Sequence, residues 1–116
     1  RKINVFFTPH LIPMFRGILS TIYLETRGRN DAQKVHSFLK EYHKNNFFVK
    51  IAKFNSHIGT GDVMNTNYCK ISVCKNRKRN KIIIVSTLDN LIKGAAGQAV
   101  QNMNVAYHLN ETLGLK

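Results

Sequence analysis

Two cysteines and five histidines are the side chains of this 116-residue sequence best suited to nucleophilic or acid–base chemistry. Cys69 and Cys74 stand five residues apart in one strand-like stretch, and this odd spacing places them on opposite faces, which argues against a disulfide between them. An activated thiolate needs a neighbouring cation or a helix N-terminus, whereas both cysteines lie in the middle of a strand pattern. We therefore interpret them as packing residues, of the kind found in a reducing compartment.

The histidines lack the spacing of a metal site. His36 and His43 lie seven residues apart, which is two turns of a helix and too far for one ion to be held easily. His57 and His108 have no partner at a ligand spacing, so we predict no metal. His10 is held between two prolines, and we interpret it as a structural or substrate-edge residue rather than as a catalytic base.

The stretch Ser86–Asn104 combines helical spacing with two glycines. Gly94 and Gly97 interrupt its apolar pattern, where each glycine costs about 1 kcal/mol relative to alanine. Their presence predicts close backbone packing or the close approach of a ligand. The apolar residues recur at intervals of three and four, as on one face of a helix: Leu88, Leu91, Ile92, Ala95, Ala99, Val100 and Met103. The candidate acceptors for the N–H groups of the helix start are Ser86, Thr87 and Asp89.

The rest of the chain supplies elements that would position these residues. A second helix is predicted from a cap at Asn30 to about Lys44, with an apolar face formed by Val35, Phe38, Leu39 and Tyr42. Five segments have strand composition: Ile3–Thr8, Gly17–Thr26, Phe47–Phe54, Thr66–Cys74 and Lys81–Thr87. Hairpin-length connections favour an α+β fold, with a mostly antiparallel or mixed sheet and helices on one face.

The net charge of +12 raises the question of an anionic partner. Much of this charge lies in one run, Lys75–Lys81, which joins two strand-like segments and is typical of a solvated hairpin tip. The sequence lacks an aromatic RNP motif, a helix-turn-helix pattern and zinc ligands. A basic nucleic-acid-binding module is therefore the alternative rather than the first hypothesis. No apolar run approaches the ~18 residues of a membrane span, and no signal peptide pattern is present.

Three segments, in family order, give the chain a family resemblance. Residues 89–104, Asp-Asn-Leu-Ile-Lys-Gly-Ala-Ala-Gly-Gln-Ala-Val-Gln-Asn-Met-Asn, resemble the C-terminal helix of N-acetyl-gamma-glutamyl-phosphate reductases, in the aspartate-semialdehyde dehydrogenase-like group. Residues 7–19, which contain Phe-Thr-Pro-His-Leu and Arg-Gly-Ile, and residues 62–69 resemble two further segments of the same family. Together the segments span nearly the whole chain and resemble about the last third of such an enzyme.

The resemblance implies that residues 1–116 form one domain, the catalytic and dimerisation domain of a larger reductase, with a glyceraldehyde-3-phosphate dehydrogenase-like fold. Such reductases convert N-acetyl-5-glutamyl phosphate to the semialdehyde with NADPH, in arginine biosynthesis, using a cysteine thiolate and a histidine acid/base. The sequence contains no Asn-Pro-Gly-Cys-type nucleophile motif, no Rossmann glycine turn and no His-Arg-His-type segment. We therefore expect NADP to be held mainly by a Rossmann domain absent from this chain, no catalytic residue here, and no activity from this chain alone.

The resemblance also implies binding residues. Arg16, at a strand start, would grip the phosphate or carboxylate of the substrate, with His10 at the substrate's edge; the alternative for Arg16 is a surface or intersubunit salt bridge. The cofactor-binding candidates, which match the helix that approaches the nicotinamide, are Asn90, Lys93, Gly94 and Gly97. Close helix packing explains the two glycines equally well.

The loop before the fourth strand-like segment departs from the family pattern. Asn67 matches the family asparagine, but Asn65 stands where the pattern has glycine, and Gly61 where lysine is often found. These departures weaken the case for a substrate contact from this loop.

The expected partners follow from the same resemblance. We expect a cytoplasmic homo-oligomer, dimer or tetramer, in which the domain meets its own Rossmann domain and the small-molecule substrate, with no membrane and no nucleic acid. Apolar residues on both faces of the second strand-like segment agree with a sheet covered by helices on one side and by a partner subunit on the other. An aspartate-semialdehyde dehydrogenase fragment is the alternative with the same fold and chemistry.

Overall fold

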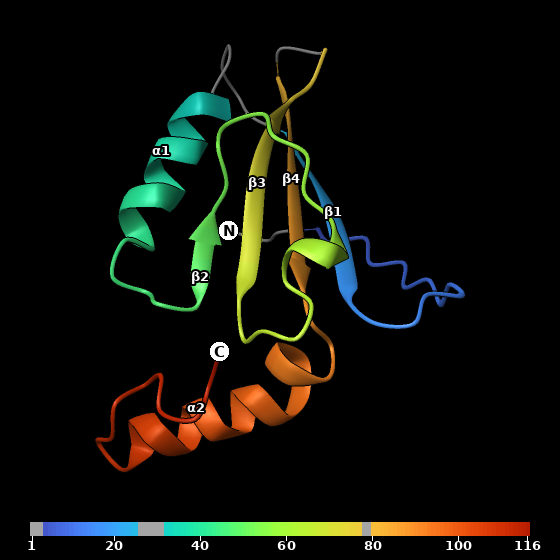
Figure 1. The fold of residues 1–116 in the computed structure, drawn as a ribbon. Coiled ribbons are helices and arrows are strands. Elements are labelled where there is room, and N and C mark those ends of the chain that lie inside the picture. Colours follow the sequence, from blue (N-terminus) through green and yellow to red (C-terminus); the bar gives the residue numbers. More distant parts are fainter. Residues whose placement is uncertain (1–3, 26–31, 78–79) are drawn as a thin grey trace.

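The structure is a computed structural model that describes residues 4–25, 32–77 and 80–116, and its centre is a four-stranded sheet (Figure 1). The strands stand in the order β1-β4-β3-β2. Their bounds are β1 (Ile18–Glu25), β2 (Val49–Ile51), β3 (Cys69–Lys75) and β4 (Lys81–Leu88), and the two α-helices are α1 (Ala32–Tyr42) and α2 (Gly97–Ala106). The predicted α+β class with a mixed sheet is confirmed.

Strand pairing confirms the basic hairpin and corrects one connection. β4 pairs antiparallel with both β1 and β3, so the basic run does join two hairpin strands, although residues 78–79 of that run lie outside the described residues. β2 instead pairs parallel with β3. A parallel pair needs a long crossover rather than a hairpin, and the chain between Ile51 and Cys69 provides it by passing in front of β3 and β4 (Figure 1).

The hydrophobic core lies between α1 and the sheet. Ala32 of α1 packs with Val73 and Ile82, while Val35 and Leu39 add further apolar surface. This confirms two of the four apolar positions predicted for the helix. The other two, Phe38 and Tyr42, are 63% and 68% exposed, so their expected burial is wrong. The sheet ends at β2, and no described strand lies beneath that side of α1.

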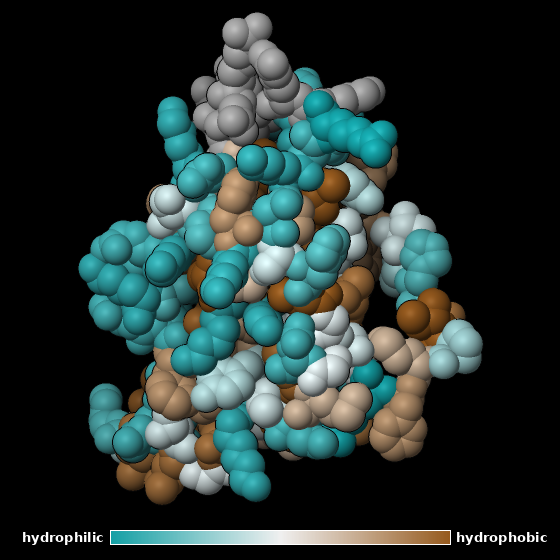
Figure 2. Space-filling view, turned by 45° about the horizontal axis from the view of Figure 1, so that its top comes forward, coloured by the Kyte–Doolittle hydropathy of each residue, from teal (hydrophilic) through white to brown (hydrophobic). Residues whose placement is uncertain are grey.

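The N-terminal segment does not form the expected strand. Residues 4–8 have no strand assignment, and Phe6 is 97% exposed. Phenylalanine and valine favour strands only where a neighbouring strand and a packed surface receive them, and no described strand pairs with this segment. Its hydrophobic side chains project from the right-hand side of the molecule in Figure 2, where Figure 1 places the segment.

The last helix begins later than the sequence indicates. Ser86 and Thr87 belong to β4, as the predicted strand Lys81–Thr87 has them, and they pair with Ser20 and Leu19 of β1. Leu88, which was expected on the helix, also belongs to β4, and the helical backbone starts as a π-helical turn, Ile92–Ala96, before α2. In Figure 1 α2 lies beyond the ends of the strands, and the chain then folds back along it. Within the described residues no helix is long and apolar enough to span a membrane.

Candidate functional site

A buried carboxylate, Asp89, joins three segments at the end of β4. It accepts hydrogen bonds from the backbone N–H of Leu91 (2.9 Å) and of Ile92 (3.1 Å), which makes it the cap of the following helical turn. It also accepts the backbone N–H of Asn65 at 2.8 Å. Asn65 has a positive φ of 62°, a conformation that asparagine tolerates better than most residues. The loop before β3 is thereby fixed to the start of the helix.

Arg16 completes this group by an ion pair. Its Nε donates to Oδ1 of Asp89 at 2.9 Å and lies 2.8 Å from Oδ2, and the side chains are 19% and 0% exposed. Burial by itself would raise the pKa of Asp89, but hydrogen bonds from Arg16 and from the three backbone N–H groups hold it below its ordinary value. Arg16 therefore makes an ion pair inside this chain, and among the described residues no contact engages its terminal nitrogens.

Asn90 holds the beginning of β1. Its side-chain oxygen accepts the backbone N–H of Gly17 at 2.8 Å. Gly17 has φ = 109°, and a Cβ at this position would stand 2.7 Å from the Cβ of Thr60, so the turn requires glycine. The cofactor candidate Asn90 and the substrate candidate Arg16 thus belong to one hydrogen-bonded junction between β1 and the helix start.

The two glycines of the helix have different surroundings. A Cβ at Gly94 would meet its nearest atoms at 3.5 to 3.8 Å, which is ordinary contact, and Gly94 is exposed. A Cβ at Gly97 would lie 2.4 Å from Oδ1 of Asn67, and Gly97 is buried. Close packing therefore accounts for Gly97, while Gly94 has only ordinary contacts and lies exposed in the π-helical turn, a feature often found at functional sites.

Lys93 lies in a polar cluster that the sequence did not reveal. Its Nζ donates to Oε1 of Gln101 (2.7 Å), which also accepts Nδ2 of Asn67 (2.8 Å), and Gln101 in turn donates to Glu111 (2.6 Å). Burial lowers the pKa of Lys93, although negative charge on Cys69 and Glu111 opposes that change. No sequence signal pointed to Gln101 or Glu111, because their contact depends on the chain folding back along α2.

The remaining candidates lie apart from this junction. His10 is exposed, and its Nδ1 donates to the backbone oxygen of Thr8 at 3.1 Å; no contact among the described residues links it to Arg16. Cys69 and Cys74 are free thiols, and their register in β3 places them on opposite faces. Over the parts of the chain that are described, no group of three or more His, Cys, Asp or Glu residues could hold a metal ion.

Comparison with known proteins connects this geometry with a family. Residues 1–90 match the family described as semialdehyde dehydrogenase, dimerisation domain. The N-acetyl-gamma-glutamyl-phosphate reductase of Clostridium beijerinckii is 45% identical over 114 residues, covering 98% of this chain and 33% of the relative. That of Staphylococcus aureus (strain MRSA252) is 42% identical over 116 residues, covering 100% of this chain and 34% of the relative. The chain thus spans about a third of the length of these relatives.

Solved structures support the fold. The aspartate semialdehyde dehydrogenase II of Vibrio cholerae matches with a TM-score of 0.64 and 23% identity, over 84% of this chain and 29% of that chain. At this identity the likeness concerns the fold alone, and it agrees with the mixed sheet described above.

Proposed function

The chain belongs to the semialdehyde dehydrogenase dimerisation-domain family, and from this we propose that it forms the C-terminal part of an NADPH-dependent N-acetyl-gamma-glutamyl-phosphate reductase. The observation that carries the proposal is the identity of 42–45% with such reductases over 98–100% of the chain. The reaction would reduce N-acetyl-5-glutamyl phosphate to N-acetyl-glutamate 5-semialdehyde, a step of arginine biosynthesis, and the protein would be cytoplasmic.

In this reaction a thiolate displaces phosphate from the acyl phosphate, and hydride from NADPH reduces the resulting thioester to the aldehyde. The sequence contains neither the nucleophile motif nor the Rossmann glycine turn. The role of this chain would therefore be to bind and orient, and we predict that the 116 residues alone are inactive.

The helix start fits a place beside the nicotinamide. The oxygen of Asn90 accepts the N–H of Gly17, which leaves its amide group as a donor for a carboxamide oxygen, and Gly94 nearby is exposed and has no side chain to block a ligand. Lys93 would supply positive charge from a position fixed by Gln101. Gly97 would contribute indirectly, by allowing α2 to pack against Asn67.

The substrate would approach the junction from the β1 side. Arg16 uses Nε for Asp89, so its terminal nitrogens would remain for a phosphate or carboxylate oxygen. His10 would lie at the edge of the substrate, as the family resemblance implies, and its segment contacts Thr60 through Met14, with 3.9 Å between Oγ1 and Sδ.

The exposed strand β1 supports a homo-oligomer. Both faces of the strand are open: Ile18, Ile22 and Leu24 on one, Leu19 and Tyr23 on the other. Clustered apolar surface of this kind marks interaction sites. We predict that sedimentation of the isolated chain gives a dimer or tetramer, and that Tyr23→Lys together with Leu19→Lys shifts it towards the monomer. A wild-type chain that stays monomeric at high concentration would contradict this.

A chimera tests the proposed activity. We would replace the C-terminal third of the Clostridium beijerinckii reductase by this chain and follow phosphate-dependent NADP reduction with N-acetyl-glutamate 5-semialdehyde. We expect activity within about tenfold of the parent enzyme, because the pocket residues supplied by the chain should suit the same substrate. The control is the same chimera carrying Leu109→Ala, a change at an exposed residue that is not part of the Asp89 junction.

The same assay separates the two substrate hypotheses. A folded, oligomeric chimera that uses aspartate semialdehyde in preference to the N-acetylated substrate would assign the chain to the aspartate-semialdehyde dehydrogenase reaction. A folded, oligomeric chimera inactive with both substrates would refute the reductase assignment.

A further inference from the structure

An exposed aromatic pair lies on α1, far along the chain from the Asp89 junction. Phe38 and Tyr42 are one turn apart, their ring centroids are 5.8 Å apart, and the planes differ by 25°, so the rings are stacked on each other. His43 continues the row, since its ring meets that of Tyr42 edge-on at 4.9 Å. The core is formed by other residues of the helix, Val35 and Leu39 among them, so internal packing does not account for this pair.

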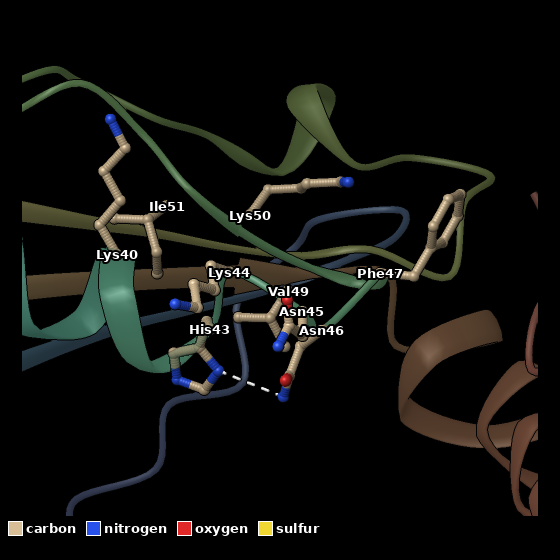
Figure 3. Close-up of a pocket in the computed structure, with 9 residues that line it drawn as sticks. All are labelled: Lys40, His43, Lys44, Asn45, Asn46, Phe47, Val49, Lys50 and Ile51. Carbon is tan, nitrogen blue, oxygen red and sulfur yellow. Dashed lines mark hydrogen bonds between the residues drawn. The ribbon is translucent and has the colours of Figure 1, made fainter.

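Cations surround a hollow at the end of this aromatic row. The hollow has a volume of about 340 Å³ and lies between the C-terminal end of α1 and β2 (Figure 3). Its lining includes His43 together with Lys40, Lys44 and Lys50. Lys50 also makes cation–π contacts. Its Nζ lies 4.8 Å from the ring centre of Phe47 and 5.0 Å from that of Tyr68.

Positive charge predominates on this surface. From Ala32 to Ile51 the sequence contains four lysines, and Glu41, which pairs with Lys44, is its one carboxylate. In Figure 3 the side chains of Lys40 and Lys50 extend in different directions rather than converging on one point. Spaced cations suit a row of phosphates along a polymer better than a single compact anion.

From these observations we propose that the surface formed by Phe38, Tyr42 and the lysines that line the hollow, Lys40, Lys44 and Lys50, binds single-stranded nucleic acid. Bases would stack on the exposed rings, which accept any base because every base has a π-face, and the backbone phosphates would lie along the lysines. This surface is distinct from the basic hairpin tip considered from the sequence, and its use does not depend on the reductase activity.

The test is fluorescence anisotropy with a labelled 12-nucleotide oligothymidylate and the full 116-residue chain over a range of salt concentrations. We expect Phe38→Ala with Tyr42→Ala to weaken binding about tenfold or more. The matched control is Tyr107→Ala, because Tyr107 is 73% exposed but lies at the end of α2. Circular dichroism would establish that each variant is folded.

Two triple variants that remove the same number of charges distinguish binding at this surface from nonspecific attraction by the net charge of the chain. Replacing Lys40, Lys44 and Lys50 by glutamine should reduce the slope of log K against log salt by about two, at ~0.7 per phosphate contact for single strands. The control replaces Lys53, Arg77 and Lys116 by glutamine, which removes the same charge elsewhere and should leave the slope nearly unchanged. Equal losses in the two triple variants would overturn the proposal.

Two further outcomes would also overturn it. Equal affinity for a 12-base-pair duplex would show that stacking on the rings contributes nothing. A change in sedimentation from oligomer to monomer in the Phe38→Ala, Tyr42→Ala variant, without loss of oligonucleotide binding, would identify the pair as a contact between copies of this chain.

Discussion

Asp89→Ala is expected to lower the free energy of unfolding by about 3 kcal/mol. The substitution removes a helix cap, which contributes about 1 kcal/mol, and leaves the N–H of Asn65 and the guanidinium of Arg16 without their partner. An unsatisfied buried donor costs about 1–3 kcal/mol. Since small domains are stable by only about 5–15 kcal/mol, this one carboxylate would account for a large part of the total. Urea unfolding measures the loss.

Asp62→Ala is the matched control. Asp62 also caps a turn, by accepting the N–H of Gly59 at 3.0 Å, but its side chain is 40% exposed and its ion pair with Lys70 is 3.5 Å long. We expect a much smaller loss than at Asp89, because a solvent-exposed ion pair contributes little to stability. Equal losses for the two aspartates would mean that the buried junction contributes no more than a surface cap.

The pH dependence of stability follows from the same carboxylate. The pKa of Asp89 is lower in the folded chain than in the unfolded chain, so its contribution is present above the unfolded value and is lost as pH falls through the folded value. Unfolding free energy should therefore fall below about pH 4, and Asp89→Asn should flatten that fall. A wild-type slope retained in Asp89→Asn would assign acid sensitivity to other carboxylates.

The sequence predicted the elements that carry their own periodicity, but not how they meet. Strand alternation located β1, β3 and β4, and helical spacing located α1 and α2. The parallel pairing of β2 with β3 was missed, because a three-residue strand and a crossover without regular spacing leave little pattern to read. The prediction of an N-terminal strand was wrong although the composition of that segment suits a strand. Strand formation also needs a neighbouring strand to pair with, and composition does not report one.

Local chemistry was likewise easier to predict than long-range contacts. Asp89 was recognisable as a cap because its hydrogen bonds run to residues two and three positions later. Its pairing with Arg16 joins residues 73 positions apart, and no local pattern reports such a contact. The contact between Gln101 and Glu111 was not predicted for the same reason. The candidate site could thus be named residue by residue, whereas its connections required the fold.

The two glycines of the last helix should respond oppositely to alanine. Alanine favours a helix over glycine by about 1 kcal/mol, so helix propensity alone predicts that both substitutions stabilise the chain. At Gly97 the new Cβ would lie 2.4 Å from Asn67 Oδ1, 2.6 Å from Ile92 Cγ2 and 2.9 Å from the Ile92 backbone oxygen. Overpacking costs about 1–3 kcal/mol, so we expect Gly97→Ala to lose about 2 kcal/mol, measured by urea unfolding.

Gly94→Ala is the internal control, since its Cβ would meet atoms no closer than 3.5 Å. It should leave stability unchanged or raise it by up to about 1 kcal/mol. The asparagine provides a second check, because Asn67 is fully buried and its amide is held by Gln101, so it cannot swing aside freely. In a background of Asn67→Ala, the cost of Gly97→Ala should shrink by about 1 kcal/mol, the coupling expected of residues in contact. Full additivity of the two changes would place the strain on Ile92 instead.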